Sequence, residues 1–232
     1  MTTQRKMSNR SRGLLIALLA APVLAINPVK NIQVFDSGFL VSFYQAQAQE
    51  ENKEPTRTRR AMAISESVNK RLAKVSALLN PEDEKAKPDL RGALAEAKDI
   101  NTSKWNEYEQ AQLYNMMGGI YVQMENYLEA IRYYKKFIET PSIPEANQLN
   151  VSYYLAQLYL ATENYKEAIK LFEDYIKRSE IVGADHYYKL GQAYYMDGNL
   201  SKSLPNIDKA VQIYESSDRI PPEGLYQYQM SL

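Results

Sequence analysis

Few residues of this chain have the types and spacing that catalysis requires. The single histidine, His186, follows Asp185 in a segment with helical periodicity, and such a residue is more often a surface residue than a general base or a metal ligand. Carboxylates cluster at 50–51 and 82–84, in expected loops without a nucleophile or a second acid nearby, so no glycosidase-type pair is indicated. The absence of cysteine excludes thiol nucleophiles and thiolate metal sites. We therefore predict a protein that is not an enzyme and that uses no cofactor and no metal.

The charge distribution argues against a nucleic-acid partner. The chain has 28 basic and 28 acidic residues, and beyond the first dozen residues its cations cluster only at Arg57, Arg59 and Arg60. A nucleic-acid footprint needs a larger basic patch than this. We interpret the arginine cluster as a solvated surface and predict that the partners include no nucleic acid and no small-molecule substrate.

The first 25 residues have the features of a signal peptide. Four cations precede a short apolar run at 13–25, and a span of the bilayer would need about 20 apolar residues. We predict export to the periplasm, with cleavage after Ala25 or, alternatively, after Ala48. Residues 26–60 are predicted to be a disordered or irregular linker, because most of this stretch lacks periodic apolar residues.

One pattern of apolar and small residues recurs in the second half of the chain. Its centre is a small residue that follows Met or Leu and that precedes a tyrosine by three positions; the small residues are Gly118, Ala156 and Gly191. These residues are 38 and 35 positions apart. A small residue repeated in a helical segment indicates that a second helix approaches closely at that point, since glycine costs a helix about 1 kcal/mol relative to alanine.

The spacing of apolar residues predicts pairs of helices. Three- and four-residue spacings predict first helices over 111–124, 149–162 and 184–197. Polar turns follow them, and the second helices are predicted at 126–140, 164–179 and 200–215. The fold class is therefore all-α.

The order and spacing of these residues resemble the tetratricopeptide (TPR) pattern of about 34 residues. The resemblance implies a right-handed α-solenoid of antiparallel helix pairs, with repeats at 105–147, 148–183 and 184–218. A degenerate N-terminal helical pair is predicted at 61–104, and a C-terminal capping helix, complete or truncated, at 219–232.

The resemblance to TPR proteins also implies a concave groove lined by the first helix of each repeat. The positions that the register assigns to partner binding are Gln112, Asn115, Asn150, Tyr153, Gln157, Tyr188, Gln192 and Tyr195. The Lys, Arg and Asn clamp with which some TPR domains hold a peptide C-terminus is not present at these positions. Tyrosine and amide side chains suit an extended or helical segment instead. The alternative, that some of the tyrosines pack between repeats, carries equal weight.

The whole arrangement resembles exported TPR proteins associated with TonB-type energy-transduction systems of gamma-proteobacteria. The resemblance is carried by the signal peptide, the degenerate pair, the repeats, the segment 141–145 and the tail at 220–226. It implies a periplasmic scaffold for protein–protein interaction, accessory to an outer-membrane uptake complex.

Alternatives to this role are an envelope assembly or division factor, which binds outer-membrane or peptidoglycan-associated proteins, and an enzyme similar to the prenyltransferase α subunit. The expected partner is a protein or peptide of the cell envelope, with membrane contact only through partners. The apolar ending of the chain is typical of a surface that joins copies into a homo-oligomer.

Overall fold

The protein folds into consecutive α-helices. The structure, a computed structural model, describes residues 64–81, 86–217, 221–222, 224–226 and 230, so the predicted signal peptide and nearly all of the predicted linker lie outside the described residues. The long helices are α2 (Glu66–Leu79), α3 (Leu90–Asp99), α4 (Glu107–Gln123), α5 (Tyr127–Ile138), α6 (Glu145–Ala161), α7 (Tyr165–Arg178), α8 (Ala184–Met196) and α9 (Leu200–Ser216). No strand occurs among the described residues.

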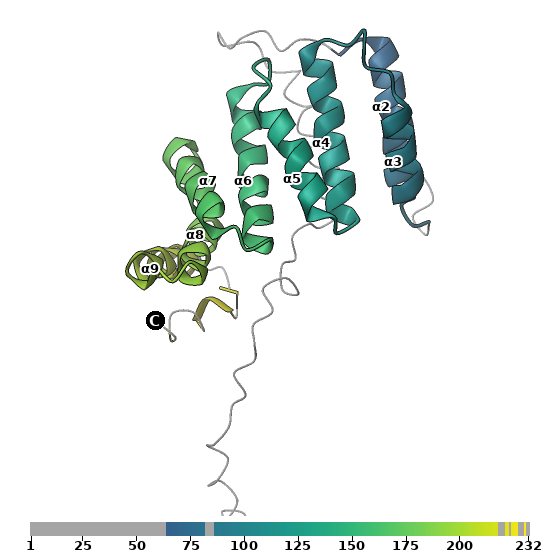
Figure 1. Cartoon of the computed structure of the whole chain (residues 1–232). Helices are drawn as coiled ribbons and strands as arrows, with labels where there is room; N and C mark the ends of the chain where they lie inside the picture. The colour runs from purple at the N-terminus through teal and green to yellow at the C-terminus, as the bar shows by residue number, and fades with distance from the viewer. Residues whose placement is uncertain (1–63, 82–85, 218–220, 223, 227–229, 231–232) are drawn as a thin grey trace, which may run out of the picture.

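The helices form a solenoid. The pairs α4–α5, α6–α7 and α8–α9 pack closely, and α5–α6 and α7–α8 join one pair to the next. In Figure 1, helices α2 to α6 lie side by side, whereas α8 and α9 are seen almost along their axes. This progressive rotation confirms the predicted all-α solenoid of helix pairs.

Two first helices begin earlier than their apolar pattern indicates. Helix α4 begins at Glu107 because Asn106 caps it: the N–H of Glu109 donates to Asn106 Oδ1 (2.9 Å), and the N–H of Asn106 donates to Glu109 Oε2 (3.0 Å). Helix α6 begins directly after Pro144, whose fixed φ suits the start of a helix. In both cases the first turn is mostly polar, so apolar spacing alone does not detect it.

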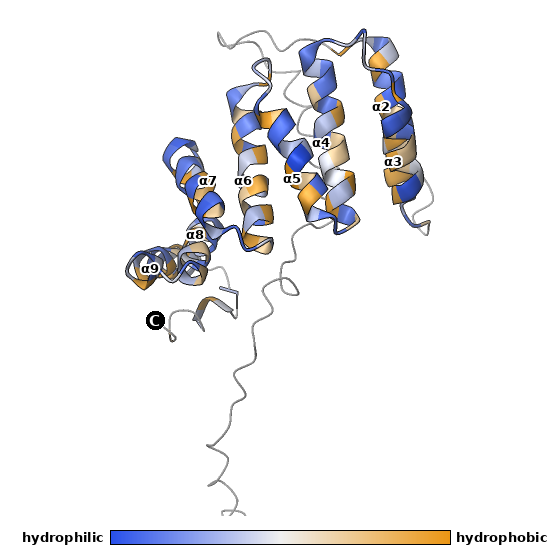
Figure 2. Cartoon of the chain, in the orientation of Figure 1, coloured by the Kyte–Doolittle hydropathy of each residue, from blue (hydrophilic) through white to orange (hydrophobic). Residues whose placement is uncertain are grey.

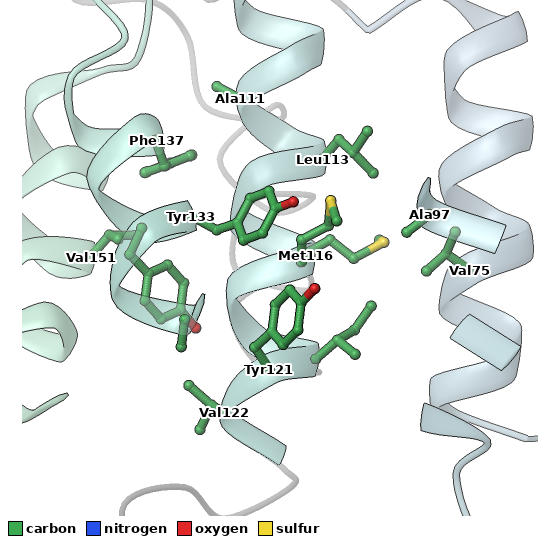
Figure 3. Packing of buried hydrophobic residues seen from close by; sticks show 14 of the residues in the cluster. Val75, Ala97, Ala111, Leu113, Met116, Tyr121, Val122, Tyr133, Phe137 and Val151 are labelled. Atoms are coloured by element: carbon green, nitrogen blue, oxygen red, sulfur yellow. The ribbon is translucent and has the colours of Figure 1, made fainter. Parts of the chain in front are cut away.

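Apolar side chains from successive helices meet along the length of the solenoid. Orange residues face the neighbouring helices in Figure 2, and blue residues cover the outside. In Figure 3, Leu113 and Met116 of α4 point toward Val75 of α2 and Ala97 of α3. Because α4 packs against the first helical pair as well as against α5, it is buried on nearly every side.

The recurring small residues lie where the second helix crosses the first, as predicted. A Cβ added to Gly118 would lie 2.6 Å from the ring of Tyr134, and one added to Gly191 would lie 2.7 Å from Ile207 Cδ1. Either distance is shorter than a real Cβ contact, so these helix pairs have no space for a side chain.

The turn within each repeat has a single backbone geometry. The residue seven positions after the small residue has a positive φ: 57° at Glu125, 62° at Glu163 and 79° at Gly198. The N–H of the following asparagine then donates to a tyrosine carbonyl near the end of the first helix, as in Asn126 to Tyr121 (2.9 Å). The third repeat has glycine at this left-handed position, whereas the first two have glutamate.

Candidate partner-binding surface

The predicted binding positions of the second and third repeats lie on α6 and α8. Asn150 is exposed, and Gln157, seven residues later on the same face of α6, is half-buried. On α8, Tyr188, Gln192 and Tyr195 follow each other at helical spacing and are also half-buried. Amide and tyrosine side chains therefore lie on one face of each of these two helices.

The two predicted positions of the first repeat do not belong to this surface. Gln112 and Asn115 have only 2% and 5% of their surface exposed, which corrects the expectation that they line an open groove. The TPR register assigns these two residues to a face of α4 but does not specify what covers that face. In the structure the start of α2 is tied to the first turn of α4, because the N–H of Ser65 donates to Glu109 Oε1 (2.9 Å).

Tyr153 packs between the second and third repeats. Its ring centroid lies 4.8 Å from that of Tyr175 on α7 and 4.9 Å from that of His186 on α8. Burial raises the pKa of the Tyr153 hydroxyl above its ordinary value, and the nearby Asp185 carboxylate raises it further. For Tyr153 the structure favours the packing role that the sequence left as an alternative.

His186 is part of the same aromatic junction. Its ring stacks on Tyr175 at 4.8 Å, and its Nδ1 accepts the N–H of Gly183 at 2.9 Å, at the start of α8. Burial lowers the pKa of His186, while the Gly183 and Asp185 contacts act in the opposite direction. His186 is half-buried rather than fully exposed at the surface, because the solenoid brings Tyr175 of the preceding repeat against its ring.

A lysine that sequence reasoning missed, Lys189, lies beside Asp185 and the tyrosines of α8. The hydroxyl of Tyr214 on α9 donates to Asp185 Oδ1. Lys189 Nζ lies 5.7 Å from the centre of the Tyr188 ring, and burial lowers the pKa of this lysine, with Asp185 partly opposing the shift. The spacing of Asp185 and Lys189, four residues apart on one helix, is the signal that could have identified them.

Tyr188 also meets the C-terminal segment. A Cβ added to Gly224 would lie 3.0 Å from the Tyr188 hydroxyl, so this tyrosine borders the residues after α9. Apart from Tyr188, the predicted positions of α6 and α8 that are at least partly exposed and do not pack in the aromatic junction are Asn150, Gln157, Gln192 and Tyr195.

Two further properties of the described residues bear on function. No group of three or more His, Cys, Asp or Glu residues in this part of the chain could hold a metal ion. No helix in the same part is both long and apolar enough to cross a membrane.

Comparison with known proteins identifies the repeats. Two profiles described as tetratricopeptide repeat match residues 109–181 and 153–218. No curated protein matches the chain. Among solved structures, MamA from residue 41 to its end, from Desulfovibrio magneticus RS-1, is similar with a TM-score of 0.52 and 22% identity, over 65% of this chain and 77% of that chain. A MamA double mutant titled RS-1 ArsTM gives a TM-score of 0.53 and 20% identity over the same shares.

At these identities the structural likeness shows the fold alone, while the two profiles identify the repeats from the sequence. Both profiles cover α6 and α7, and together they extend from the first turn of α4 to the end of α9. The chain therefore contains tetratricopeptide repeats between residues 109 and 218.

Proposed function

We propose that this protein is a non-enzymatic scaffold of the periplasm that binds a protein or peptide partner, as an accessory to a TonB-type energy-transduction complex. The observation that carries the binding role is the row of amide and tyrosine side chains on α6 and α8, at Asn150, Gln157, Gln192 and Tyr195. Amide groups can both donate and accept hydrogen bonds, so they can pair with the backbone of a bound segment.

The nature of this row favours a neutral peptide segment over a charged terminus. Lys189 is the cation near it, and burial already disfavours the charged form of this side chain. A peptide carboxylate is usually held by exposed Arg or Lys groups that keep their charge. The side chains present here suit an extended or helical segment held by stacking on Tyr195 and by hydrogen bonds to Asn150 and Gln157.

The location and the TonB association rest on the sequence. The basic and apolar segments within residues 1–25 support export, and the resemblance to exported TPR proteins supports an accessory role in outer-membrane uptake. A scaffold of this kind brings envelope components together and needs no reactive group of its own.

Crosslinking capture of the tagged protein from envelope fractions tests this proposal. We compare wild type with Asn150→Ala/Gln157→Ala/Tyr195→Ala, and use Lys166→Ala/Lys170→Ala, two exposed positions on α7, as the matched control. We expect energy-transduction components in the wild-type and control captures and their loss in the triple variant.

Other results of the capture distinguish the parts of the proposal. Capture that the triple variant leaves unchanged would move the binding site away from α6 and α8. Capture of outer-membrane or peptidoglycan-associated assembly proteins instead would contradict the TonB role and support the alternative of an envelope assembly factor.

A further inference from the structure

Three cationic side chains surround a pair of stacked tyrosines in the first repeat. Tyr121 of α4 stacks on Tyr133 of α5, with ring centres 5.5 Å apart and planes inclined by 16° (Figure 3). Lys98 Nζ, on α3, lies 5.7 Å from the centre of the Tyr121 ring. The guanidinium carbon of Arg132 and Lys136 Nζ, both on α5, lie 4.8 Å and 5.4 Å from the centre of the Tyr133 ring. We infer that these three cations bind an acidic segment of a protein partner.

The cations are accessible to a partner, whereas the two rings belong to the core. Lys98, Arg132 and Lys136 are exposed, but Tyr121 and Tyr133 are only 6% and 9% exposed. Because a cation is attracted to the face of an aromatic ring, the buried rings gather these otherwise mobile side chains at one place. A hydrogen bond with the Tyr121 hydroxyl raises the pKa of Lys98, so this side chain keeps its charge at neutral pH.

Positive charge exceeds negative charge on this surface. The carboxylate of Glu129 forms an ion pair with Arg132 (2.7 Å) and so neutralises one of the three cations. Within the described part of the chain, neither Lys98 nor Lys136 forms an ion pair with a carboxylate. An acidic segment would supply the carboxylates that these two ammonium groups lack.

The other repeats show that the solenoid does not require this combination of residues. At the repeat spacings of 38 and 35 residues, the equivalents of Tyr133 are Leu171 and Asn206. The equivalent of Lys136 in the second repeat is an acid, Asp174. Of the three repeats, the first alone therefore combines tyrosine and lysine at these positions, and the packing of helix pairs does not account for them.

The repeat register leaves this face of α5 open. Leu128 lies one turn before Arg132 on the same face and is 72% exposed. Its equivalents, Lys166 on α7 and Ser201 on α9, are exposed as well. For α7 the helices on both sides are described, so a neighbouring repeat does not cover this position. Leu128 thus offers an apolar contact beside the cations.

These properties favour a protein segment over nucleic acid or a lipid surface. A nucleic-acid footprint needs a larger cationic patch than three side chains, one of which already pairs with Glu129. Recognition of anionic lipids likewise takes clusters of about four or more Lys and Arg. An exposed leucine among the cations suits a segment that carries an apolar residue among its carboxylates. Opposite charges then select the partner and speed its association.

Fluorescence anisotropy with a synthetic peptide tests this inference. The probe is a fluorescein-labelled peptide of alternating glutamate and aspartate residues with one central leucine, and it is titrated with the full chain. We expect saturable binding that weakens as the salt concentration rises, and at least tenfold weaker binding to Lys98→Gln/Lys136→Gln. The matched control is Lys166→Gln/Lys170→Gln, which removes the same two charges from exposed positions of α7 and is expected to bind like wild type.

All four lysines are on the surface, so circular dichroism is expected to show wild-type helix content in both variants. Leu128→Ser, which leaves the charge unchanged, is expected to weaken binding without altering its salt dependence. Equal binding to the two lysine variants, or no binding to wild type, would overturn the inference.

Other occupants give different results. If duplex DNA or phosphatidylserine vesicles bind wild type and lose binding to Lys98→Gln/Lys136→Gln, while the peptide does not bind, the assignment of an acidic protein segment is wrong. The chain has acidic residues of its own at Glu50, Glu51 and Glu54. If replacing these three by glutamine tightens binding of the peptide, the occupant is this stretch of the same chain and the assignment of a partner is wrong.

This surface is separate from the row of side chains on α6 and α8 and goes beyond the function proposed for it. The capture variant Asn150→Ala/Gln157→Ala/Tyr195→Ala is therefore expected to bind the acidic peptide like wild type. Failure of one proposal is distinguishable from failure of the other, because each has its own variant and its own ligand.

Discussion

The carboxylate of Glu109 joins the beginning of α4 to Ser65, a residue 44 positions earlier in the chain that precedes α2. One oxygen accepts the N–H of Ser65, and the other accepts the N–H of Asn106 at the start of its own helix. The side chain is 4% exposed. A single carboxylate thus satisfies two backbone donors at helix starts that belong to different helical pairs.

Replacing Glu109 by glutamine is expected to lower the free energy of unfolding by about 1–3 kcal/mol, because one of the two buried acceptor oxygens becomes an amide donor. Urea denaturation measures the change. Glu107→Gln, an exposed residue of the same turn, is the control and is expected to have little effect. Equal stability of the two variants would show that the Ser65 contact contributes nothing.

The same carboxylate makes stability depend on acid. Burial alone raises the pKa of Glu109, but the hydrogen bonds from Ser65 and Asn106 outweigh it and hold the pKa below the ordinary value of 4.5. Its contribution is therefore fully present above pH 4.5 and is lost as the pH falls through the lowered folded-state pKa. We expect the stability difference between wild type and Glu109→Gln to shrink over that range in denaturant titrations at successive pH values.

His186 makes stability depend on pH nearer neutrality. Its folded-state pKa lies below 6.5, so the unfolded chain binds a proton more readily and the stability that the neutral ring provides is lost as the pH falls below 6.5. Because the chain has one histidine, His186→Gln is expected to remove this dependence. Unfolding midpoints at pH 7.5 and 5.5 provide the measurement, and an unchanged pH dependence in the variant would contradict the assignment.

Glycine at Glu125 or Glu163 is expected to stabilise the protein by up to about 1 kcal/mol, because both glutamates occupy a left-handed conformation that glycine adopts without a Cβ penalty. Gly198→Ala, at the equivalent turn, is expected to destabilise by a similar amount. Thermal unfolding of the three variants measures both effects. Lys170→Gly, at an exposed position inside α7, is the control and is expected to cost about 1 kcal/mol, since glycine weakens a helix interior.

Gly118→Ala is expected to cost about 1–3 kcal/mol, because the new methyl group would collide with the ring of Tyr134 on α5. Helix propensity alone predicts the opposite sign. Stability relative to wild type in urea therefore decides between the two effects. A second substitution, Tyr134→Leu, is expected to recover part of the lost stability, because it removes the ring that the methyl group meets. If Gly118→Ala instead stabilised the protein, α4 and α5 would be able to separate at this point at no cost.

Much of the fold could be predicted because a TPR solenoid is made of local pairs. Apolar spacing and the small residues Gly118 and Gly191 specify each helix and where its partner crosses it. The starts of α4 and α6 were missed because polar capping, rather than apolar spacing, determines them. The left-handed glutamates were missed as well, since glutamate is not a residue that normally indicates such a turn.

The candidate site was predicted less completely than the fold. The register assigned equivalent positions in every repeat to the groove; Gln157 and Tyr195 are partly exposed, but the equivalent positions of the first repeat are not. Gln112 is buried, and Tyr153 packs against His186, because burial depends on the elements that lie across each helix. That information is contained in contacts between repeats, which a single repeat pattern does not describe.

The hydrogen bond between Ser65 and Glu109 has a consequence for the order in which the helices unfold under force. In a chain whose helices contact chiefly their neighbours in sequence, unravelling proceeds one helix at a time from an end. At the N-terminal end, releasing α2 breaks a bond to α4, so the first step there disturbs three helices together. Toward the C-terminus, Leu200 and Leu204 in the N-terminal half of α9 are exposed, and no helix within the described residues covers them. Under a pulling force we therefore expect α9 to separate from the described helices before α2 does.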